Sequence, residues 1–484
     1  MAYLKDLLKQ VTYICTRGTM DCKVTHICHD SRQVVRGSMF ICLAGSREDG
    51  HDYLAQAISK GAAVCVVSKH VWVEGDVTVI RVRNTSEAMA WIARNYYGAP
   101  AEAMQMIGIT GTKGKTTTAC MLYQMLKEAG VKCGLIGTLG VRRSDGLKKP
   151  GSNTTPDALV LQKELREMAD AGCSCCVMEV SSQGLKHYRV EGITFAIGIY
   201  TNLSMDHIGP GEHRSFREYA CCKKRLFERS RMICINADDK YHGFMTADLS
   251  APVYTYGIEQ PCDVKAEHIV YERSSRGLNV TYQTTGWIKD EIVLKMPGTA
   301  NVYNSLAAME AAHLLGISPE TIRKTLRNVS VKGRIEEVRI SDKFDVVIDY
   351  AHNAASLESL IKTLRQYQPK RLVLLFGCGG NRSPLRRFQM GETAGRLSDI
   401  TILTSDNPRY EKPEAILSDI EQGMKRTKGK YKIIPDRREA ISYAISQAQE
   451  GDLIVVAGKG HEEYQEIEGH FYPMNEREMI ENSI

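Results

Sequence analysis

Short runs of apolar residues alternate with amphipathic stretches along most of the chain. Each run has the length of a strand, is rich in Val, Ile and Leu, and leads through a polar loop into apolar positions at helical spacing. Uninterrupted apolar strands are typical of parallel sheets that helices cover on both faces. The runs are AAVCVV, MQMIGIT, CSCCVMEV, FAIGIYTNL, FDVVIDYA, RLVLLFG, DITILTSD and DLIVVAGKG. The pattern therefore predicts an α/β protein with doubly wound parallel sheets.

Two breaks in this pattern divide the chain into three segments. Gly98 and Pro100 interrupt a helix before the strand that begins near Met104. The second break falls at Gly333, after which the chain carries its own series of strands. At 484 residues the chain is too long for a single hydrophobic core. We therefore expect three domains, which span residues 1–98, 99–333 and 334–484.

The charge and the hydropathy of the chain exclude several classes of function. With 63 basic and 57 acidic residues the net charge is +6, which gives no reason to expect a nucleic-acid-binding surface. Lys5, Asp6 and Lys9 prevent the first residues from forming the apolar core of a signal peptide. The apolar runs are far shorter than a membrane span. We expect a cytoplasmic protein that does not insert into membranes.

The 15 cysteines do not predict disulfides or a zinc site. Disulfides are rare in proteins that are not exported. The cluster of Cys173, Cys175 and Cys176 and the pair Cys221 and Cys222 lack a second CxxC or a histidine at zinc-finger spacing. Reduced, mostly buried thiols are therefore the expectation.

The stretch GITGTKGKTTT predicts a phosphate-binding loop between a strand and a helix. Gly111 and Gly114 allow the backbone to approach phosphate oxygens, and a helix from about Lys115 directs N–H groups toward them. Lys115 would neutralise the β- and γ-phosphates, and the Thr116 hydroxyl would ligate Mg²⁺. The loop is shorter than G-x-x-x-x-G-K-[ST]. The expected nucleotide-binding residues are Gly111, Thr112, Lys113, Gly114, Lys115, Thr116 and Thr117.

Polar side chains also follow the next two apolar strands. Glu179 ends the run VMEV, and Asp206 and His207 follow FAIGIYTNL. Each of these residues by itself could be an ordinary solvated loop residue. Ligands of open α/β sheets, however, collect at the carboxyl ends of the strands. Strand ends that share one rim with a phosphate loop favour a metal site at that rim.

Beyond these strands, the segment HRSFREYACCKKRLFERS predicts a helix that starts near Phe216. Ser215 and Glu218 form a capping-box pattern in front of it. Lys223 and Lys224 fall inside this helix, and spacing alone favours a pair of solvated surface lysines.

A series of motifs resembles that of the Mur ligases, in the order seen in that family. The motifs are GITGTKGKTTT, SNTTPD, EVSSQGL, TNLSMDH, CKKRLF, NVYNSLAA, GRIEEV, DYAHN, SDNPR and GKGHE. The segment VTHICHDSRQVVRGSMFICLAG is similar to the N-terminal domain of these enzymes. The resemblance covers essentially the whole chain and accounts for the short glycine spacing. It implies a UDP-substrate-binding domain, a central P-loop-type ATPase domain and a Rossmann-like C-terminal domain that binds an amino acid.

The resemblance implies ATP-dependent amide formation in the synthesis of peptidoglycan precursors. The D-glutamate γ-carboxylate of a UDP-N-acetylmuramoyl dipeptide would take the γ-phosphoryl group of ATP, and an amine would attack the acyl phosphate. Mg²⁺ held by Thr116 and Glu179 would bridge ATP oxygens, with a second ion near His207. The family pattern A-K-x-x-L-F assigns the carbamylated lysine that holds this second ion to Lys223. The expected catalytic residues are Lys115, Glu179, His207 and Lys223, and the expected metal ligands are Thr116, Glu179, His207 and Lys223.

Other site residues are assigned by the resemblance alone. Contacts with the UDP-linked substrate are expected from Ser31, Asn153, Thr154, Thr155, Ser181 and Arg189. Contacts with the nucleotide are expected from Asn304 and Arg334, next to the DYAH strand end at Asp349 and His352. Asn301 and Asn304 could equally be helix-capping residues.

The four residues Asp406, Asn407, Pro408 and Arg409 bear on the choice of amine. They resemble the signature of family members that add meso-diaminopimelate, whose distal carboxylate a guanidinium can bind bidentately. Arg387, Gly458 and Glu462 match the remaining contacts with the amino acid. An Asn-Pro turn with an exposed arginine is the alternative without a ligand. L-Lysine or another diamino acid remains the near alternative as substrate.

Three further hypotheses are a related ligase, a nucleotide-binding scaffold and a P-loop motor or switch. A folylpolyglutamate-type ligase would have no use for the N-terminal HDSR segment. A non-catalytic nucleotide-binding scaffold would not need the expected catalytic residues together, and a P-loop motor or switch would not need the third domain. We expect a monomer that binds ATP, the UDP-linked dipeptide and a diamino acid.

Overall fold

The computed structural model describes residues 2–45, 48–149, 151, 153–209, 211–274 and 277–483. The chain forms two compact units. The first comprises Met1–Lys265 with Leu306–Thr321, and the second comprises Ala266–Ser305 with Ile322–Ile484. Ser152, the first residue of the SNTTPD motif, lies outside the described residues. Among the residues that the structure describes, no helix is both long and apolar enough to span a bilayer.

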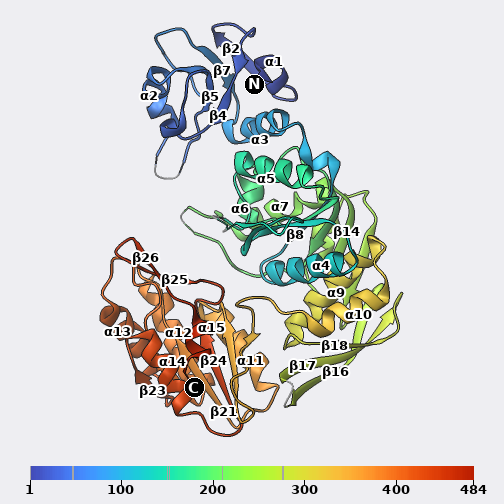
Figure 1. Ribbon diagram of the computed structural model, residues 1–484, viewed down its shortest axis with the longest axis vertical. Helices are drawn as coiled ribbons and strands as arrows, with labels where there is room; N and C mark the ends of the chain where they lie inside the picture. The colour runs from blue at the N-terminus through green and yellow to red at the C-terminus, as the bar shows by residue number, and fades with distance from the viewer. Residues whose placement is uncertain are drawn as a thin grey trace. The chain divides into compact units, whose positions relative to one another are not determined.

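The N-terminal part of the first unit is a small α/β layer (Figure 1). Its five-stranded sheet has the order β2 (Tyr13–Arg17), β7 (Thr78–Val82), β6 (Ala62–Val67), β5 (Ser38–Ile41) and β4 (His26–Cys28), with β2 antiparallel to β7 and the others parallel. A second pair joins β1 (Ala2–Tyr3) and β3 (Lys23–Val24). The helices are α1 (Leu4–Leu7), η1 (Ser31–Gln33), η2 (Gly50–Tyr53), α2 (Leu54–Ser59) and α3 (Thr85–Tyr96). The Asn84 side chain begins α3 by accepting the N–H groups of Ser86 and Glu87.

The sheet that follows in the first unit is parallel in its middle. Its order is β11 (Lys148–Lys149), β10 (Gly140–Arg142), β9 (Cys133–Gly137), β12 (Cys175–Glu179), β8 (Gln105–Thr110), β13 (Phe195–Tyr200), β14 (Ser230–Asn236) and β15 (Val253–Gly257). All neighbours from β9 to β15 are parallel, and the first residues of β16 (Val264–Ser274) add to β15. Its helices are η3 (Pro100–Ala103), α4 (Lys115–Glu128), α5 (Ala158–Asp170), α6 (Ser182–Lys186), α7 (Phe216–Lys224), η4 (Phe227–Arg229) and α8 (His242–Thr246).

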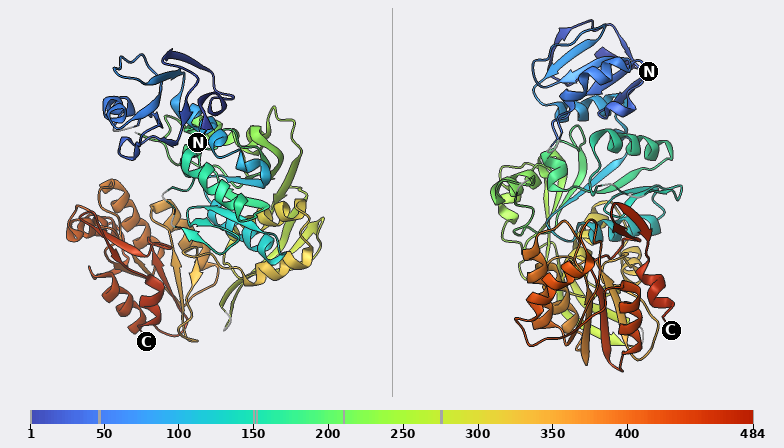
Figure 2. Two further views of the ribbon diagram at one scale, coloured as in Figure 1. Left: turned by 45° about the horizontal axis from the view of Figure 1, so that its top comes forward. Right: turned by 90° about the vertical axis from the view of Figure 1, so that its left-hand side faces the viewer.

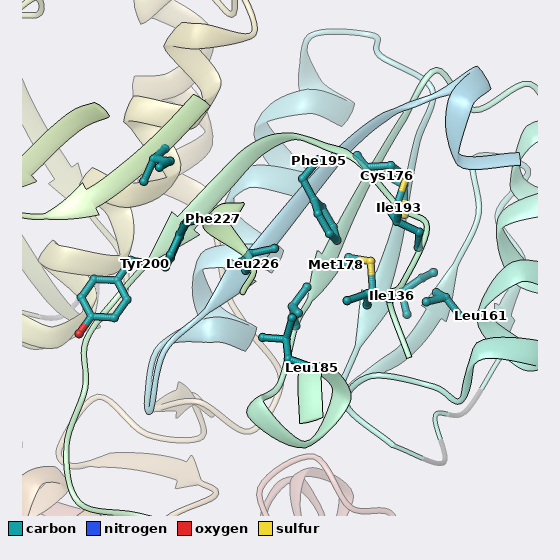
Figure 3. Packing of buried hydrophobic residues seen from close by; sticks show 14 of the residues in the cluster. Ile136, Leu161, Cys176, Met178, Leu185, Ile193, Phe195, Tyr200, Leu226 and Phe227 are labelled. Atoms are coloured by element: carbon teal, nitrogen blue, oxygen red, sulfur yellow. The ribbon is translucent and has the colours of Figure 1, made fainter. Parts of the chain in front are cut away.

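Successive side chains along these strands point to opposite faces of the sheet, and helices cover both faces. Met106, Ile136 and Met178 belong to one buried cluster with residues of α5 and of the segment after α7. Figure 3 shows Ile136 and Met178 close to Leu161 of α5. The helix α4 packs on the opposite face (Figure 1). Both faces are therefore buried, which is why the strands are apolar throughout.

The register of the central strands brings the predicted strand ends to one rim. Glu179 at the end of β12 is paired with Ile109 of β8, and Tyr200 at the end of β13 is paired with Thr110. The loops after these three strands therefore start at the same level, next to one another.

The second unit contains a six-stranded sheet with helices on both faces (Figure 2). The order is β19 (Glu336–Glu337), β20 (Asp345–Asp349), β24 (Asp452–Ala457), β21 (Arg371–Phe376), β22 (Ile400–Leu403) and β23 (Lys430–Ile433), parallel except for β19. The helices are α11 (Ala354–Arg365), α12 (Pro384–Leu397), α13 (Pro413–Met424), α14 (Arg437–Ser446) and α15 (Glu476–Glu481). Residues of α14 and α15 share one core with the sheet.

The remaining elements are two hairpins and two helices. The strand β17 (Gly277–Gly286) pairs antiparallel with β18 (Glu291–Leu294), and β25 (Tyr464–Ile467) pairs with β26 (His470–Pro473). The helices are α9 (Thr299–Leu314) and α10 (Pro319–Asn328). The predicted α/β class with parallel, doubly wound sheets is confirmed, whereas the domain boundaries at 98/99 and 333/334 stay predictions. All 15 cysteines are free and eleven of them are buried.

Candidate active site

The glycine-rich loop joins β8 to α4 and has a shape that only glycine allows. Gly111 has a φ of 151°, and a Cβ atom there would lie 1.9 Å from the Oγ1 of Thr201. Gly114 has a φ of 87° and forms the N-cap of α4, which has no side-chain cap. Anion-binding helix starts have this same combination of a glycine-rich turn and a first turn that no side chain caps.

Residues that follow β13 hold this loop in place. The main-chain carbonyl of Asn202 accepts the N–H of Thr112 at 2.8 Å, and its side-chain oxygen accepts the N–H of Lys113 at 3.0 Å. The Thr201 hydroxyl donates to the carbonyl of Lys113 at 2.7 Å. Sequence reasoning assigned no role to these two residues, although they belong to the TNLSMDH motif. They give the loop its shape before any nucleotide arrives.

Glu179 and Thr116 form the first candidate metal site. The Thr116 hydroxyl donates to the Oε2 of Glu179 at 2.9 Å, and Glu179 is 1% exposed. Thr138, which sequence reasoning missed, donates its N–H to Oε1 at 2.8 Å and its hydroxyl to Oε2 at 3.2 Å. Gly137 makes room for the carboxylate, because a Cβ atom there would lie 2.3 Å from Oε1.

The donor atoms at this position fit Mg²⁺. A hydroxyl and a carboxylate are hard oxygen ligands, and Mg²⁺ usually takes one or two protein ligands together with phosphate oxygens and water. Within the described parts of the chain, no three His, Cys, Asp or Glu side chains lie close enough to hold a metal by themselves. A metal here would therefore depend on nucleotide oxygens as well.

Lys223 lies inside the site, as the family pattern indicated. The helix α7 begins after Ser215, whose side chain accepts the N–H of Glu218, so the predicted helix start is confirmed. Lys223 is 1% exposed, and its Nζ donates to the carbonyl of Gly111 at 2.7 Å. Burial, together with the nearby charge of Lys115, lowers the pKa of Lys223 well below that of an ordinary lysine. Lys224 is less buried and lies over the ring of Phe244.

His207 lies in the loop after β13. Its φ of 54° is in the left-handed region that non-glycine residues rarely adopt. Its Nδ1 is 3.1 Å from the Oε1 of Glu212, and its ring centroid is 6.1 Å from that of Tyr219. The Nζ of Lys223 lies 4.6 Å from the same Tyr219 ring, whose hydroxyl is 3.0 Å from that of Thr112. The Tyr219 ring therefore neighbours both His207 and Lys223.

The residues expected to bind the UDP-linked substrate surround the backbone of Glu179. The Thr155 hydroxyl donates to the carbonyl of Glu179 at 2.9 Å and accepts the N–H of Ser181 at 2.9 Å. Arg189 donates to the carbonyl of Thr155 at 2.7 Å. The hydroxyls of Thr154 and Thr138 are 3.1 Å apart. The SNTTPD and EVSSQGL motifs are thus bonded to each other and to the candidate metal site. Asn153 of the first motif is exposed.

Ser31 is nearly buried in η1, and its hydroxyl donates to the side chain of Gln56 at 2.6 Å. Close by, the Nε2 of His29 is 3.9 Å from the Oδ1 of Asp157, the last residue of the SNTTPD motif. The HDSR and SNTTPD segments therefore lie next to each other, as a shared substrate would require.

The residues expected to face the nucleotide from the second unit lie in two places. The guanidinium of Arg334 lies 4.9 Å from the ring centroid of Tyr350, beside the strand end at Asp349. Burial raises the pKa of Asp349 and lowers that of His352. Asn301 and Asn304 are bonded to each other at 3.0 Å within α9. Asn301 lies in the first turn of α9, and its side chain donates to the carbonyl of Pro297 at 2.8 Å. The nucleotide contact and the helix-capping alternative both stay predictions.

A small cavity of about 130 Å³ in the second unit gathers most of the residues expected to bind the amino acid. Pro408 belongs to the turn beside it, and its carbonyl accepts the N–H of Glu411 at 3.0 Å. The predicted residues that line the cavity are Arg387, Asp406, Asn407, Arg409, Gly458 and Glu462, and Arg382 and Arg386 also line it.

Hydrogen bonds fix the side chains of Asn407 and Arg409 in the DNPR segment. Arg409 donates its Nε to Glu466 at 2.9 Å and one terminal nitrogen to the carbonyl of Gly380 at 2.9 Å. Asn407 donates to Glu462 at 2.9 Å and accepts from the buried Lys459 at 2.9 Å. Sequence reasoning missed Lys459, although it stands within the GKGHE motif.

Arg387 is bonded to carboxylates of the protein itself. It is 2% exposed, forms a bidentate pair with Glu411 at 2.8 and 2.9 Å, and also donates to Asp419 at 2.9 Å. Its contact with an amino acid stays a prediction. Arg382 and Arg386 are exposed and line the same cavity. Sequence reasoning missed both, and the signal was the cluster of arginines in GGNRSPLRR.

Three family models match the chain. They are the Mur ligase family catalytic domain over residues 23–97, the Mur ligase middle domain over 109–312, and the Mur ligase glutamate ligase domain over 333–460.

Relatives and solved structures agree with these matches. The chain is 41% identical over 482 residues to a UDP-N-acetylmuramoyl-L-alanyl-D-glutamate–2,6-diaminopimelate ligase of Caldanaerobacter subterraneus, covering 99% of this chain and 98% of the relative. A ligase of the same name from Clostridium perfringens is 38% identical over 488 residues, with the same coverage. The solved structure of another such ligase is 30% identical and superposes with a TM-score of 0.69, covering 95% of this chain and 94% of the other. The chain therefore belongs to the Mur ligase family.

Proposed function

We propose that the protein is an ATP-dependent ligase that adds meso-2,6-diaminopimelate to UDP-N-acetylmuramoyl-L-alanyl-D-glutamate. The observation that carries the proposal is the buried Lys223, bonded to Gly111 of the phosphate loop. A nucleotide switch, a motor or a scaffold has no use for a buried amine at this position. Relatives that match nearly the whole chain carry the name of this ligase.

At the nucleotide, the proposed roles follow from the hydrogen bonds of the loop. The Nζ of Lys115 now donates to the carbonyls of Gly111 and Thr112 at 2.9 and 3.0 Å, close to where β- and γ-phosphates would lie. Thr116 and Glu179 would hold Mg²⁺, which when bound offsets the negative charge that two reacting anions bring together. Thr138 keeps the Glu179 carboxylate oriented throughout.

A neutral lysine amine can react with CO₂. In this step the Nζ lone pair of Lys223 forms a bond to the carbon of CO₂ and releases a proton, which leaves a carbamate anion. The low pKa of Lys223 favours the neutral amine that this reaction needs. The carbamate would then supply oxygen ligands for a second Mg²⁺ near His207, in place of an ammonium group that cannot bind a cation.

For the amine substrate, the cavity of the second unit offers both signs of charge. Arg382, Arg386 and Arg409 line it together with Asp406 and Glu462. Diaminopimelate carries two carboxylates and two ammonium groups, and this arrangement would pair with each kind. L-Lysine has one carboxylate fewer, so one guanidinium that lines the cavity would receive no carboxylate from the substrate. L-Lysine nevertheless remains the alternative substrate.

The proposed reaction uses ATP and a UDP-linked precursor, which places it in the cytoplasm, and we propose that the monomer carries it out. The product distinguishes a ligase from a non-catalytic scaffold. Mass spectrometry after incubation with ATP, Mg²⁺, the UDP-linked dipeptide and diaminopimelate should detect the amide-linked UDP-tripeptide. Recovery of unchanged dipeptide alongside intact ATP would contradict the proposal.

A further inference from the structure

Hydrogen bonds join the described residues His207, Gly209, Glu212 and His213 to one another. The N–H of His213 donates to the carbonyl of His207 at 3.0 Å, and the N–H of Gly209 donates to the carbonyl of His213 at 3.1 Å. The N–H of Glu212 donates to the carbonyl of Gly209 at 3.1 Å. These bonds return the chain to His207 and place the Glu212 side chain beside the imidazole.

Two contacts with α6 anchor the returning part of this loop. His213 is fully buried, and its Nε2 lies 2.9 Å from the hydroxyl of Ser182. The ring of His213 also packs on Tyr219 with centroids 5.2 Å apart. The Nζ of Lys186 donates to the carbonyl of Glu212 at 2.6 Å. The backbone that carries Glu212 is therefore fixed to α6, while the side chains of Glu212 and His207 are both exposed.

The contact between Glu212 and His207 determines which ring nitrogen carries the proton. The Oε1 of Glu212 lies 3.1 Å from the Nδ1 of His207. A carboxylate can only accept a hydrogen bond, so Nδ1 is the donor in this contact, and the tautomer with its proton on Nδ1 has the Nε2 lone pair available for a metal. Histidines that ligate metals commonly donate their other N–H to a carboxylate in this way.

We infer that Glu212 is a positioning residue that presents the Nε2 of His207 to the second metal ion. The inference rests on the proposed function, because it requires His207 to be a metal ligand. Glu212 itself would not touch the metal or the substrates. It acts through the tautomer and the ring orientation of His207, and the anchored loop after β13 supplies the carboxylate.

The tautomer can be measured without any metal. In protein labelled with ¹⁵N-histidine at about pH 8, where an ordinary imidazole is neutral, two-bond ¹⁵N–¹H correlations distinguish the two tautomers. The His207 resonances, assigned by their loss in His207→Ala, should show a protonated Nδ1. In Glu212→Ala the ring should shift toward the tautomer with the proton on Nε2, and Glu212→Gln, which keeps an acceptor, should shift less. Glu228→Ala is the matched control, since Glu228 is an exposed glutamate on the nearby η4.

Metal affinity provides the second readout. Electron paramagnetic resonance measures Mn²⁺ binding in the presence of a non-hydrolysable ATP analogue. In Glu212→Ala, the affinity for Mn²⁺ should weaken about 10-fold or more at one site. The Glu228→Ala control should bind like the parent protein. An unchanged tautomer or an unchanged Mn²⁺ affinity in Glu212→Ala would overturn the inference. If His207→Ala also leaves Mn²⁺ binding unchanged, the proposed role of His207 itself fails, and a missing tripeptide product would show separately that the proposed reaction is wrong.

Discussion

Lys115 and Lys223 share one acceptor, the carbonyl oxygen of Gly111, at 2.9 and 2.7 Å. Two ammonium groups this close would repel each other, and Lys223 is also cut off from water. Both effects lower the pKa of Lys223, with burial as the larger cause. The loop therefore combines a lysine placed for phosphate with a second lysine whose neutral form is favoured.

This relationship predicts different outcomes for two adjacent lysines. Lys223→Ala should lower kcat for ATP-dependent ligation roughly 100-fold, the usual scale for losing one group that stabilises charge in a transition state. Lys224→Ala should keep most of the activity, because Lys224 lies on Phe244 rather than at the loop. Short carboxylic acids should partly restore Lys223→Ala by replacing the carbamate. Equal losses in the two variants would contradict the assignment.

A glycine on β9 allows Glu179 to occupy its position. In Gly137→Ala the new Cβ atom would lie 2.3 Å from the Oε1 of Glu179, so the carboxylate must move away from Thr116. We expect the Mg²⁺ concentration for half-maximal activity to rise about 10-fold while the fold is retained. Gly134→Ala on the same strand is the control, because its Cβ atom meets the flexible end of Met168. A Mg²⁺ requirement that is the same in both variants would speak against the Glu179 site.

Much of the first site could be predicted from the sequence because parallel strands end at a common rim. Glu179 and His207 each follow an apolar run, and that position along the chain translates directly into position in space. The supporting residues could not be found in this way. Thr138 reaches Glu179 only through the pairing of β9 with β12. Asn202 accepts main-chain N–H groups of the loop with its carbonyl and its side-chain oxygen, which no residue pattern reveals.

The roles of the arginines in the second unit were harder still to predict from the sequence. GGNRSPLRR presents three guanidinium groups, and spacing alone does not tell which of them is buried. The partners of Arg387 lie 24 and 32 residues further along the chain, after β22 in the sequence. Only the folded structure shows that Arg387 is bonded to Glu411 and Asp419, while the exposed Arg382 and Arg386 line the cavity.

Arg387 and Arg382 should accordingly fail in different ways when each is replaced by alanine. Arg387→Ala leaves two carboxylates without their partner in a partly buried site, and should lower the free energy of unfolding by about 3 kcal/mol. Arg382→Ala should change stability by less than about 0.5 kcal/mol, as is usual for exposed residues. It should instead raise the KM for diaminopimelate about 10-fold. Urea unfolding and steady-state kinetics on both variants measure these effects. A raised KM in Arg387→Ala with a loss of stability in Arg382→Ala would instead indicate that Arg387 contacts the amino acid.

His461 should make the second unit sensitive to acid. Burial, with Arg334 nearby, lowers the pKa of His461 to about 4. The unfolded chain then binds a proton more readily than the folded chain, so this stability is complete above about pH 6.5 and is lost as the pH falls toward 4. We expect a loss of roughly 2 kcal/mol across that window, and a smaller one in His461→Gln. Unfolding curves of both proteins over the same pH range should diverge; parallel curves would show that His461 does not contribute.

The most direct test of the account is phosphate release with ATP, Mg²⁺ and the UDP-N-acetylmuramoyl dipeptide, in the presence of meso-diaminopimelate, L-lysine or no amino acid. We expect sustained phosphate release with diaminopimelate, little with L-lysine and none without an amine. Preference for L-lysine would keep the acyl-phosphate chemistry and reject the role given to the arginine-lined cavity. No release with either amine, from protein that still binds ATP, would contradict the ligase assignment.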